Sequence, residues 1–213
     1  QDHEVSYSPS ATLLVLTSRA RPLRRDVALA LGCDGGQLAH VPAEMGAIAG
    51  TFSGLTLFTG DQASRERLET FAPQADVIHV AAHGDFRPDA PLFSFVALAD
   101  GRWQAADVYR QRFNASLVTL GACQTGRGRL AGGDRIGFAH ALFYAGAQAV
   151  LASLWPVHDA STATLMAVLY RGIRHGERKA AALRHAQLAL LRSKQWQDPL
   201  YWAPFCLSGA DGV

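Results

Sequence analysis

Short apolar runs alternate with helical stretches along most of this chain, and this alternation limits the fold more than any other feature. Because strands that are separated by helices pair in parallel, it predicts an α/β fold, with a mostly parallel sheet covered by helices on both faces. About six runs have the length and composition of strands. They are Thr12–Leu16, Gly54–Phe58, Asp76–Ala82, Ser116–Leu120, Gln148–Leu154 and Ala203–Gly209.

The stretches between these runs have helical periodicity. In the fifth of them Leu165, Leu169 and Ile173 share one face. Asp159 or Ser161 is the predicted N-cap of this helix, and Gly176 marks its predicted end. The predicted helices are Met45–Phe52, Ser64–Phe71, Ala105–Arg112, Gly137–Gly146, Ser161–Ile173 and Glu177–Ser193.

The sequence "FVALADGRWQ" departs from this pattern, because an apolar run followed by Asp-Gly predicts a small hairpin. No internal repeat, low-complexity tract or linker is visible, so residues 1–213 are expected to form a single domain. The chain starts at Gln1 with a polar stretch, and we expect it to be the C-terminal part of a longer protein.

Charge and hydropathy argue against nucleic-acid and membrane partners. The net charge is only +2, and Arg127, Arg129 and Arg135 cluster without interleaved aromatic residues. Residues 136–157 carry no charge and have the length of a membrane span. Polar residues, glycines and a proline interrupt this segment, however, so a helix followed by a buried strand explains it better than a transmembrane helix.

Cysteine usage indicates a reducing compartment. The three cysteines, Cys33, Cys123 and Cys206, are odd in number and lack CxxC spacing, which argues against a disulfide framework and a cysteine zinc site. A cytoplasmic location is therefore expected. Cys206 alternates with core residues of the last strand and is interpreted as a small buried hydrophobic residue.

Cys123 stands apart because the apolar run "SLVTL" breaks into a glycine-rich turn just before it. Gly121 begins that turn, so Cys123 follows the carboxyl end of a predicted central strand. Open α/β sheets bind their ligands at this edge. A cysteine that served only for packing would more naturally lie inside the apolar run.

A second strand ends in the same way. The run "DVIHVAA" is followed by His83 and Gly84, and adjacent parallel strands would bring His83 close to Cys123. An imidazole helps a thiol to ionise, as nucleophilic cysteine chemistry requires. The backbone N–H groups of Gly84 and Cys123 could form an oxyanion hole. His79 and His83 could also form a metal pair, but no further ligand has suitable spacing, so no metal or other cofactor is expected.

A phosphatase is the alternative enzyme class. "CQTGRGR" fits the C-x5-R loop of cysteine phosphatases, with Arg129 as its arginine. Ala122 and Leu130 replace the usual histidine and hydroxyl residue, and "LAGGDR" delays the helix that would bind phosphate. This chemistry would also leave His83 without a role.

Several motifs together resemble the CHAT domain, a caspase-like peptidase family of the clan that includes caspases, separase and gingipains. The resemblance covers essentially the whole chain and implies a caspase-like three-layer sandwich. Such domains typically end larger bacterial proteins, often after tetratricopeptide-like repeats, which would make an N-terminal repeat region a regulatory partner. The motifs are "VIHVAAHGDF", "LVTLGACQTGRG", "AGGDRIGFAHALFYAGAQAVLASLWPVHDAST" and "DPLYWAPFCLSG".

The resemblance also assigns roles to residues. It implies that Cys123 is the nucleophile and His83 the catalytic histidine of an endopeptidase acting on proteins, with Gly84 contributing to the oxyanion hole. Asp159 matches an acidic position that would select Arg or Lys before the scissile bond (the P1 residue), although it could equally be a helix cap. Gly121 departs from the serine common in the family and offers no side chain to the pocket.

The function expected from this resemblance is that of a regulated effector in bacterial signalling or defence. The alternative within the same fold is a catalytically weak scaffold that binds other proteins. An intact pair of His83 and Cys123 favours the peptidase.

Overall fold

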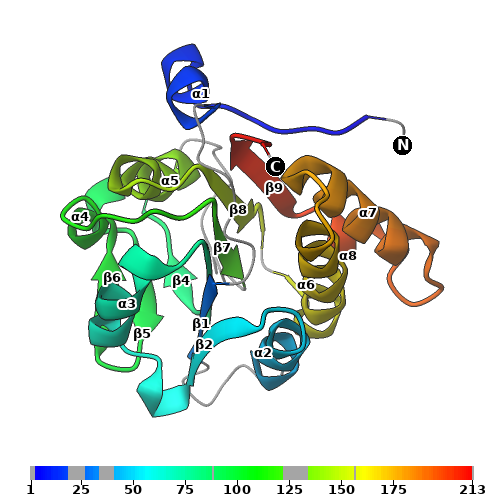
Figure 1. Ribbon diagram of the computed structural model, residues 1–213, viewed down its shortest axis with the longest axis horizontal. Helices are drawn as coiled ribbons and strands as arrows, with labels where there is room; N and C mark the ends of the chain where they lie inside the picture. The colour runs from blue at the N-terminus through cyan, green and yellow to red at the C-terminus, as the bar shows by residue number, and fades with distance from the viewer. Residues whose placement is uncertain are drawn as a thin grey trace.

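A computed structural model describes residues 3–18, 27–33, 41–87, 89–121, 134–155 and 157–212; the side chains of residues 134–137 and Asp159 are not described. A six-stranded sheet in the order β2-β1-β3-β7-β8-β9 forms its centre (Figure 1). All neighbouring strands are parallel except β8 and β9. The strands are β1 (Val27–Cys33), β2 (Gly54–Thr59), β3 (Val77–Ala82), β7 (Leu117–Gly121), β8 (Ala149–Ser153) and β9 (Phe205–Gly209).

The α/β prediction is confirmed, and five of the six predicted strands are present, but the sixth was misplaced. In the central sheet, the strand that the sequence analysis missed is β1, which lies between β2 and β3. Its sequence alternates alanine with leucine, and both faces are buried. Alanine is depleted in strands, so the run gives a weak strand signal although its small side chains fit beneath packed helices.

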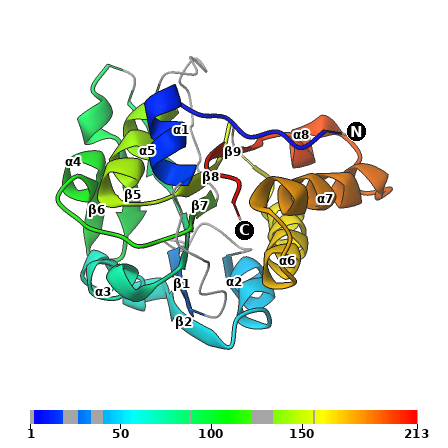
Figure 2. The same cartoon turned by 45° about the horizontal axis from the view of Figure 1, so that its top comes forward.

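The predicted strand Thr12–Leu16 is instead part of a helix, α1 (Ala11–Ser18). Ser10 stabilises its start, because the Ser10 hydroxyl oxygen accepts a hydrogen bond from the N–H of Leu13 at 3.1 Å. The segment before α1 runs beside the last strand, where Tyr7 forms a parallel bridge with Ser208 (Figure 2). A local cap thus outweighs the strand propensity of the apolar run.

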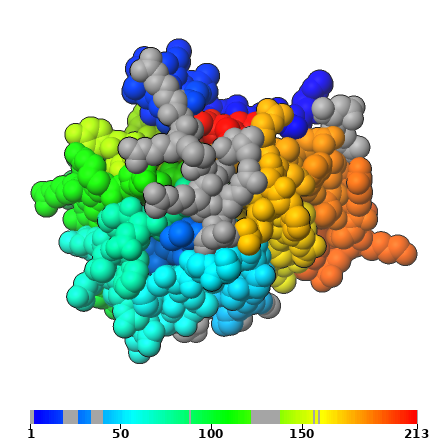
Figure 3. Space-filling model, in the orientation of Figure 1, coloured from blue at the N-terminus to red at the C-terminus, as the bar shows by residue number. Residues whose placement is uncertain are grey.

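Helices cover both faces of the sheet (Figures 1 and 2). We call the side covered by α3, α4 and α5 the α5 face and the side covered by α2, α6 and α7 the α6 face; α2 packs against α6 and α6 against α7 (Figure 3). The helices are α2 (Val41–Ala49), α3 (Arg65–Phe71), α4 (Ala105–Val108), α5 (Asp134–Ala145), α6 (Asp159–Arg174), α7 (Lys179–Arg192) and α8 (Pro199–Trp202). Short 3-10 turns lie at Gly60–Gln62, Ala72–Gln74 and Pro91–Phe93.

The predicted hairpin forms β5 (Phe95–Leu98) and β6 (Gly101–Gln104), which pair antiparallel. A third short strand, β4 (Gly84–Asp85), adds to β5 and completes a small second sheet. Because β4 follows β3 after a single residue, this small sheet is joined directly to the carboxyl end of a central strand.

The predicted helix ends were partly correct. Gly176 follows the last turn of α6 with a positive φ of 96°, as the sequence predicted. The N-cap is His158, and neither Asp159 nor Ser161 takes that position. The Ser161 hydroxyl instead donates to the carbonyl oxygen of His158 at 2.8 Å.

Two other sequence expectations concern hydrophobicity. Within the described parts of the chain, no helix combines the length and hydrophobicity needed to cross a membrane. Cys206 lies in β9 opposite Ala152 and is half-buried rather than fully enclosed.

Candidate active site

The predicted catalytic residues follow two neighbouring strands of the central sheet in the chain. β3 and β7 are adjacent and parallel, and Ala81 lies opposite Gly121. His83 and Cys123 each follow this facing pair by two residues in the sequence. Cys123 itself, with the rest of the 122–133 loop, lies outside the described residues. What the fold establishes is that both chain positions follow the same edge of the sheet.

His83 is half-buried and is tied to the small sheet through its backbone. Its carbonyl oxygen accepts a hydrogen bond from the N–H of Ala97 at 2.7 Å. Its side-chain Nε2 is buried and has no hydrogen-bond partner among the described residues. Buried polar atoms normally have partners, so this nitrogen is placed to interact with a group that the described residues do not supply.

Gly84 is buried in β4 opposite Val96 of β5. In an antiparallel pair, hydrogen-bonded and non-hydrogen-bonded positions alternate. Because the preceding residue, His83, accepts a bond from Ala97, Gly84 occupies a non-hydrogen-bonded position. Its N–H therefore points away from β5, toward the open edge of β4.

Asp159 begins α6, the helix that follows β8, and β8 is the strand next to β7. The backbone of Asp159 is thus near the carboxyl edge of the sheet, on the α6 face. Its side chain is not described, so its predicted place in a substrate pocket stays a prediction.

A buried polar cluster lies beneath the end of β7, and the sequence analysis did not identify it. Glu44 of α2 and His79 of β3 are 2% and 1% exposed, and Glu44 Oε1 lies 3.1 Å from His79 Nε2. His79 Nδ1 forms a hydrogen bond with the hydroxyl of Tyr170 in α6 at 2.8 Å. Burial raises the pKa of the Tyr170 phenol, and the Glu44 charge adds to this effect.

The same cluster bears on the alternative that His79 and His83 bind a metal. Both ring nitrogens of His79 face groups within the protein core, Tyr170 and Glu44.

The sequence did contain a signal for the buried cluster, because Glu44 is the one charged residue of the helix "VPAEMGAIA". A lone carboxylate within an apolar helix is rarely buried without a specific partner.

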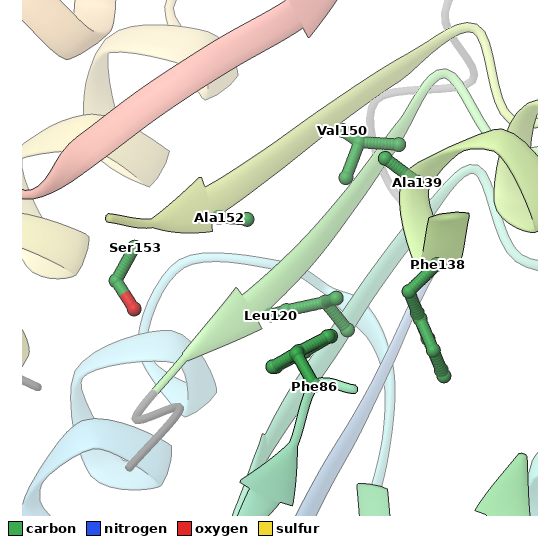
Figure 4. A pocket seen from close by; sticks show the side chains of 7 residues that line it. All are labelled: Phe86, Leu120, Phe138, Ala139, Val150, Ala152 and Ser153. Carbon is green, nitrogen blue, oxygen red and sulfur yellow. The ribbon is translucent and has the colours of Figure 1, made fainter. Parts of the chain in front are cut away.

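A small hollow lies on the other face of the sheet, where β7 and β8 end (Figure 4). Its walls are almost entirely apolar, and the Phe86 and Phe138 rings meet edge to face at 5.6 Å. Ser153 supplies the one hydroxyl. The lining residues are Phe86, Leu120, Phe138, Ala139, Val150, Ala152 and Ser153.

Comparison with known protein families identifies the family of this chain. The model of the CHAT domain matches residues 1–210. The chain belongs to the CHAT domain family. Two curated relatives are similar to this CHAT domain: human tetratricopeptide repeat protein 28, 33% identical over 131 residues, and its mouse counterpart, 34% identical over 107 residues. These alignments cover 62% and 50% of the chain but only 5% and 4% of the relatives.

Solved structures show that the fold is caspase-like. Separase in the Saccharomyces cerevisiae separase–securin complex aligns with 98% of the CHAT domain at a TM-score of 0.69 and 13% identity, over 14% of its own chain. The Arg-specific cysteine proteinase gingipain R aligns with 95% at a TM-score of 0.61 and 11% identity, over 52% of its chain. The expected three-layer, caspase-like architecture is therefore confirmed. The C-x5-R loop of the phosphatase alternative lies outside the described residues.

Proposed function

We propose that this CHAT domain is a cysteine endopeptidase that cleaves protein substrates through His83 and Cys123. The observation that carries the proposal is the register of β3 and β7, because Ala81 faces Gly121 and each reactive residue follows two positions later. The family match and the caspase-like fold also support this proposal.

In the proposed mechanism the Cys123 thiolate attacks the scissile carbonyl carbon and forms a tetrahedral intermediate. His83 takes the thiol proton and returns it to the leaving amine as the peptide bond breaks. Water then hydrolyses the thioester with His83 as the base, and this releases the carboxylic acid and restores the thiol. Neither a metal nor an organic cofactor takes part in these steps.

The oxyanion of the intermediate would be stabilised by the N–H groups of Gly84 and Cys123. The orientation of the Gly84 N–H, away from β5, supports this role. Asp159 would favour Arg or Lys at P1, because a carboxylate binds a guanidinium through two parallel hydrogen bonds.

We propose further that the domain acts in the cytoplasm as the regulated effector of a longer signalling or defence protein, as expected for bacterial members. The named relatives carry tetratricopeptide repeats and are far longer than this chain, which supports a repeat region as the regulatory partner. Those two relatives are from human and mouse, so the similarity is not confined to bacteria.

The proposal is tested by mass-spectrometric analysis of peptide-library cleavage by wild type, Cys123→Ala, His83→Ala and Asp159→Ala. Loss of the nucleophile should lower the rate by at least about 10³-fold, and loss of His83 by about 10²–10⁴-fold. Asp159→Ala should weaken the preference for Arg and Lys. If wild type cleaves nothing even when it is tested together with its proposed regulatory repeat region, the endopeptidase proposal fails and a protein-binding module is favoured. If Cys123→Ala retains full activity, the assigned nucleophile is wrong.

A further inference from the structure

The Glu44 carboxylate lies where a side chain at position 121 would be. A Cβ atom placed on Gly121 would lie 2.7 Å from Glu44 Oε1 and 3.4 Å from His79 Nε2. The absence of a side chain on Gly121 therefore makes room for a carboxylate that comes from α2. Gly121 precedes the proposed nucleophile, Cys123, by two residues, so this carboxylate is beside the last residue of β7.

This carboxylate is buried and incompletely paired. Oε1 lies 3.1 Å from His79 Nε2, a contact that is an ion pair only if His79 is protonated, and neither atom has a hydrogen-bond partner among the described residues. His79 satisfies its other nitrogen through Tyr170. A buried carboxylate oxygen that lacks a hydrogen-bond donor is costly, so we expect Oε1 to meet a partner that supplies one.

The position of Glu44 suits a long basic side chain. Two residues extend by at most about 7 Å, so a substrate whose carbonyl meets Cys123 has its P1 side chain within reach of Gly121. Arginine and lysine end in donors on long flexible stems, and the guanidinium of arginine matches a carboxylate with two hydrogen bonds. α2 packs against α6, which begins with Asp159, so both acidic residues belong to the α6 face.

We propose that Glu44 is a specificity-determining residue whose carboxylate forms the floor of the P1 pocket and binds the guanidinium or ammonium group of the substrate. This inference rests on the proposed peptidase function and deepens it. The inference assigns the charged contact with the P1 side chain to Glu44 of α2, because Gly121 has no side chain that could make it. Asp159 would then contribute from the start of α6.

The first test compares wild type, Glu44→Gln and Gly121→Ala in peptide-library cleavage. Glu44→Gln should lower cleavage after Arg and Lys by roughly 10- to 100-fold relative to other residues, because a charge-assisted hydrogen bond is lost. Gly121→Ala should lower it less, because the added Cβ displaces a flexible carboxylate. Glu66→Gln makes the same chemical change on exposed α3 and should leave the preference unchanged. An unchanged P1 preference in folded Glu44→Gln would overturn the inference and leave the peptidase proposal standing.

The second test does not depend on catalysis. Agmatine, which carries the guanidinium of arginine, is titrated into the full chain bearing Cys123→Ala, and binding is followed by calorimetry. Adding Glu44→Gln should weaken binding by at least about tenfold, whether or not the wild type cleaves peptides. If wild type cleaves nothing but this loss is seen, the peptidase proposal fails and the basic pocket stands. Equal binding with and without Glu44 overturns the pocket. If Glu44→Gln does not fold, Gly121→Ala decides both tests.

Discussion

Both faces of the central sheet carry an apolar core, but the α6 face also holds the buried polar cluster of Glu44, His79 and Tyr170. On the α5 face, β3 and β7 present the apolar side chains Ile78, Val80, Val118 and Leu120. On the α6 face, the alternate positions of the same two strands include His79 and Thr119, both buried. Strands project successive side chains to opposite faces, so the same two strands contribute to the cores on both faces. We therefore expect substitutions in the α5-face core to change mainly stability, whereas Glu44, the residue proposed for specificity, lies on the α6 face.

Aromatic packing distinguishes the α5 face further. Trp103 of β6 is fully buried, and its ring meets Phe138 of α5 edge to face at 5.4 Å. Phe138 also contacts Phe86, close to the end of β4. These rings hold the small sheet that follows His83 against α5. The α6 face uses Tyr170 differently, since its hydroxyl bonds a buried histidine while its ring packs against Phe52.

The largest expected effect is on the α5 face, where Trp103→Ala should lower the free energy of unfolding by about 3–5 kcal/mol. The cost comes from the lost apolar contacts and from the cavity beside Phe138. Urea denaturation followed by circular dichroism measures it. The comparison predicts that the P1 preference of the folded fraction stays that of wild type. A changed P1 preference would show that the two faces are not separable in this way.

A smaller effect is expected on the α6 face, where Tyr170→Phe should cost about 1–3 kcal/mol at neutral pH, because His79 Nδ1 loses its partner. Burial raises the folded-state pKa of Tyr170 above its ordinary value of 10.0, so its stabilising contribution is complete below that pH and is lost as the pH rises above it. The gap in unfolding free energy between wild type and Tyr170→Phe should therefore shrink above pH 10.

Denaturation from pH 7 to 11 measures this gap. The matched control is Tyr144→Phe, which removes a hydroxyl from a tyrosine of α5 that is 62% exposed. Its effect on stability should be small. If the gap for Tyr170→Phe is the same at every pH, burial of the phenol does not link stability to alkaline pH.

The smallest effect concerns Asp100, beside α3 on the α5 face. Its carboxylate accepts hydrogen bonds from the N–H groups of Arg65 at 2.6 Å and Glu66 at 3.2 Å. Burial opposes ionisation, but these donors outweigh it and lower the pKa below the ordinary 3.8. Asp100→Asn should cost about 0.5 kcal/mol at neutral pH, because the site is exposed and screened by solvent.

A carboxyl group whose pKa is lowered by folding stabilises the fold at a pH above its ordinary pKa. This contribution is lost as the pH falls through the folded-state pKa. The difference between wild type and Asp100→Asn should therefore shrink as the pH falls below 3.8 and through the folded-state pKa, in contrast to the alkaline sensitivity of the α6 face. Asp61→Asn, on an exposed turn, serves as the control. A difference that persists unchanged at low pH would contradict the assignment.

The candidate site was proposed from local sequence patterns, whereas parts of the framework around it depended on distant neighbours. His83 and Cys123 were identified because each follows an apolar run at a glycine, a pattern that local sequence records fully. β1 was missed, and Thr12–Leu16 was predicted to be a strand although it is part of a helix. Both are apolar runs whose secondary structure depends on the residues that surround them in the fold. Ser10 caps α1, whereas the alanines of β1 become a strand only between β2 and β3.

What the sequence determined by itself was the alternation of elements, the family and the two residues proposed for catalysis. These rest on periodicity and on motifs whose members are close together in the chain. Tertiary structure alone decided that β3 and β7 are neighbours in register, and that Glu44 fills the space beside Gly121. Residues 44 and 121 are far apart in the chain, and no local pattern reports such a contact. Strand pairing and helix packing bring them together, because α2 packs on the α6 face of the sheet, where it lies beside the end of β7.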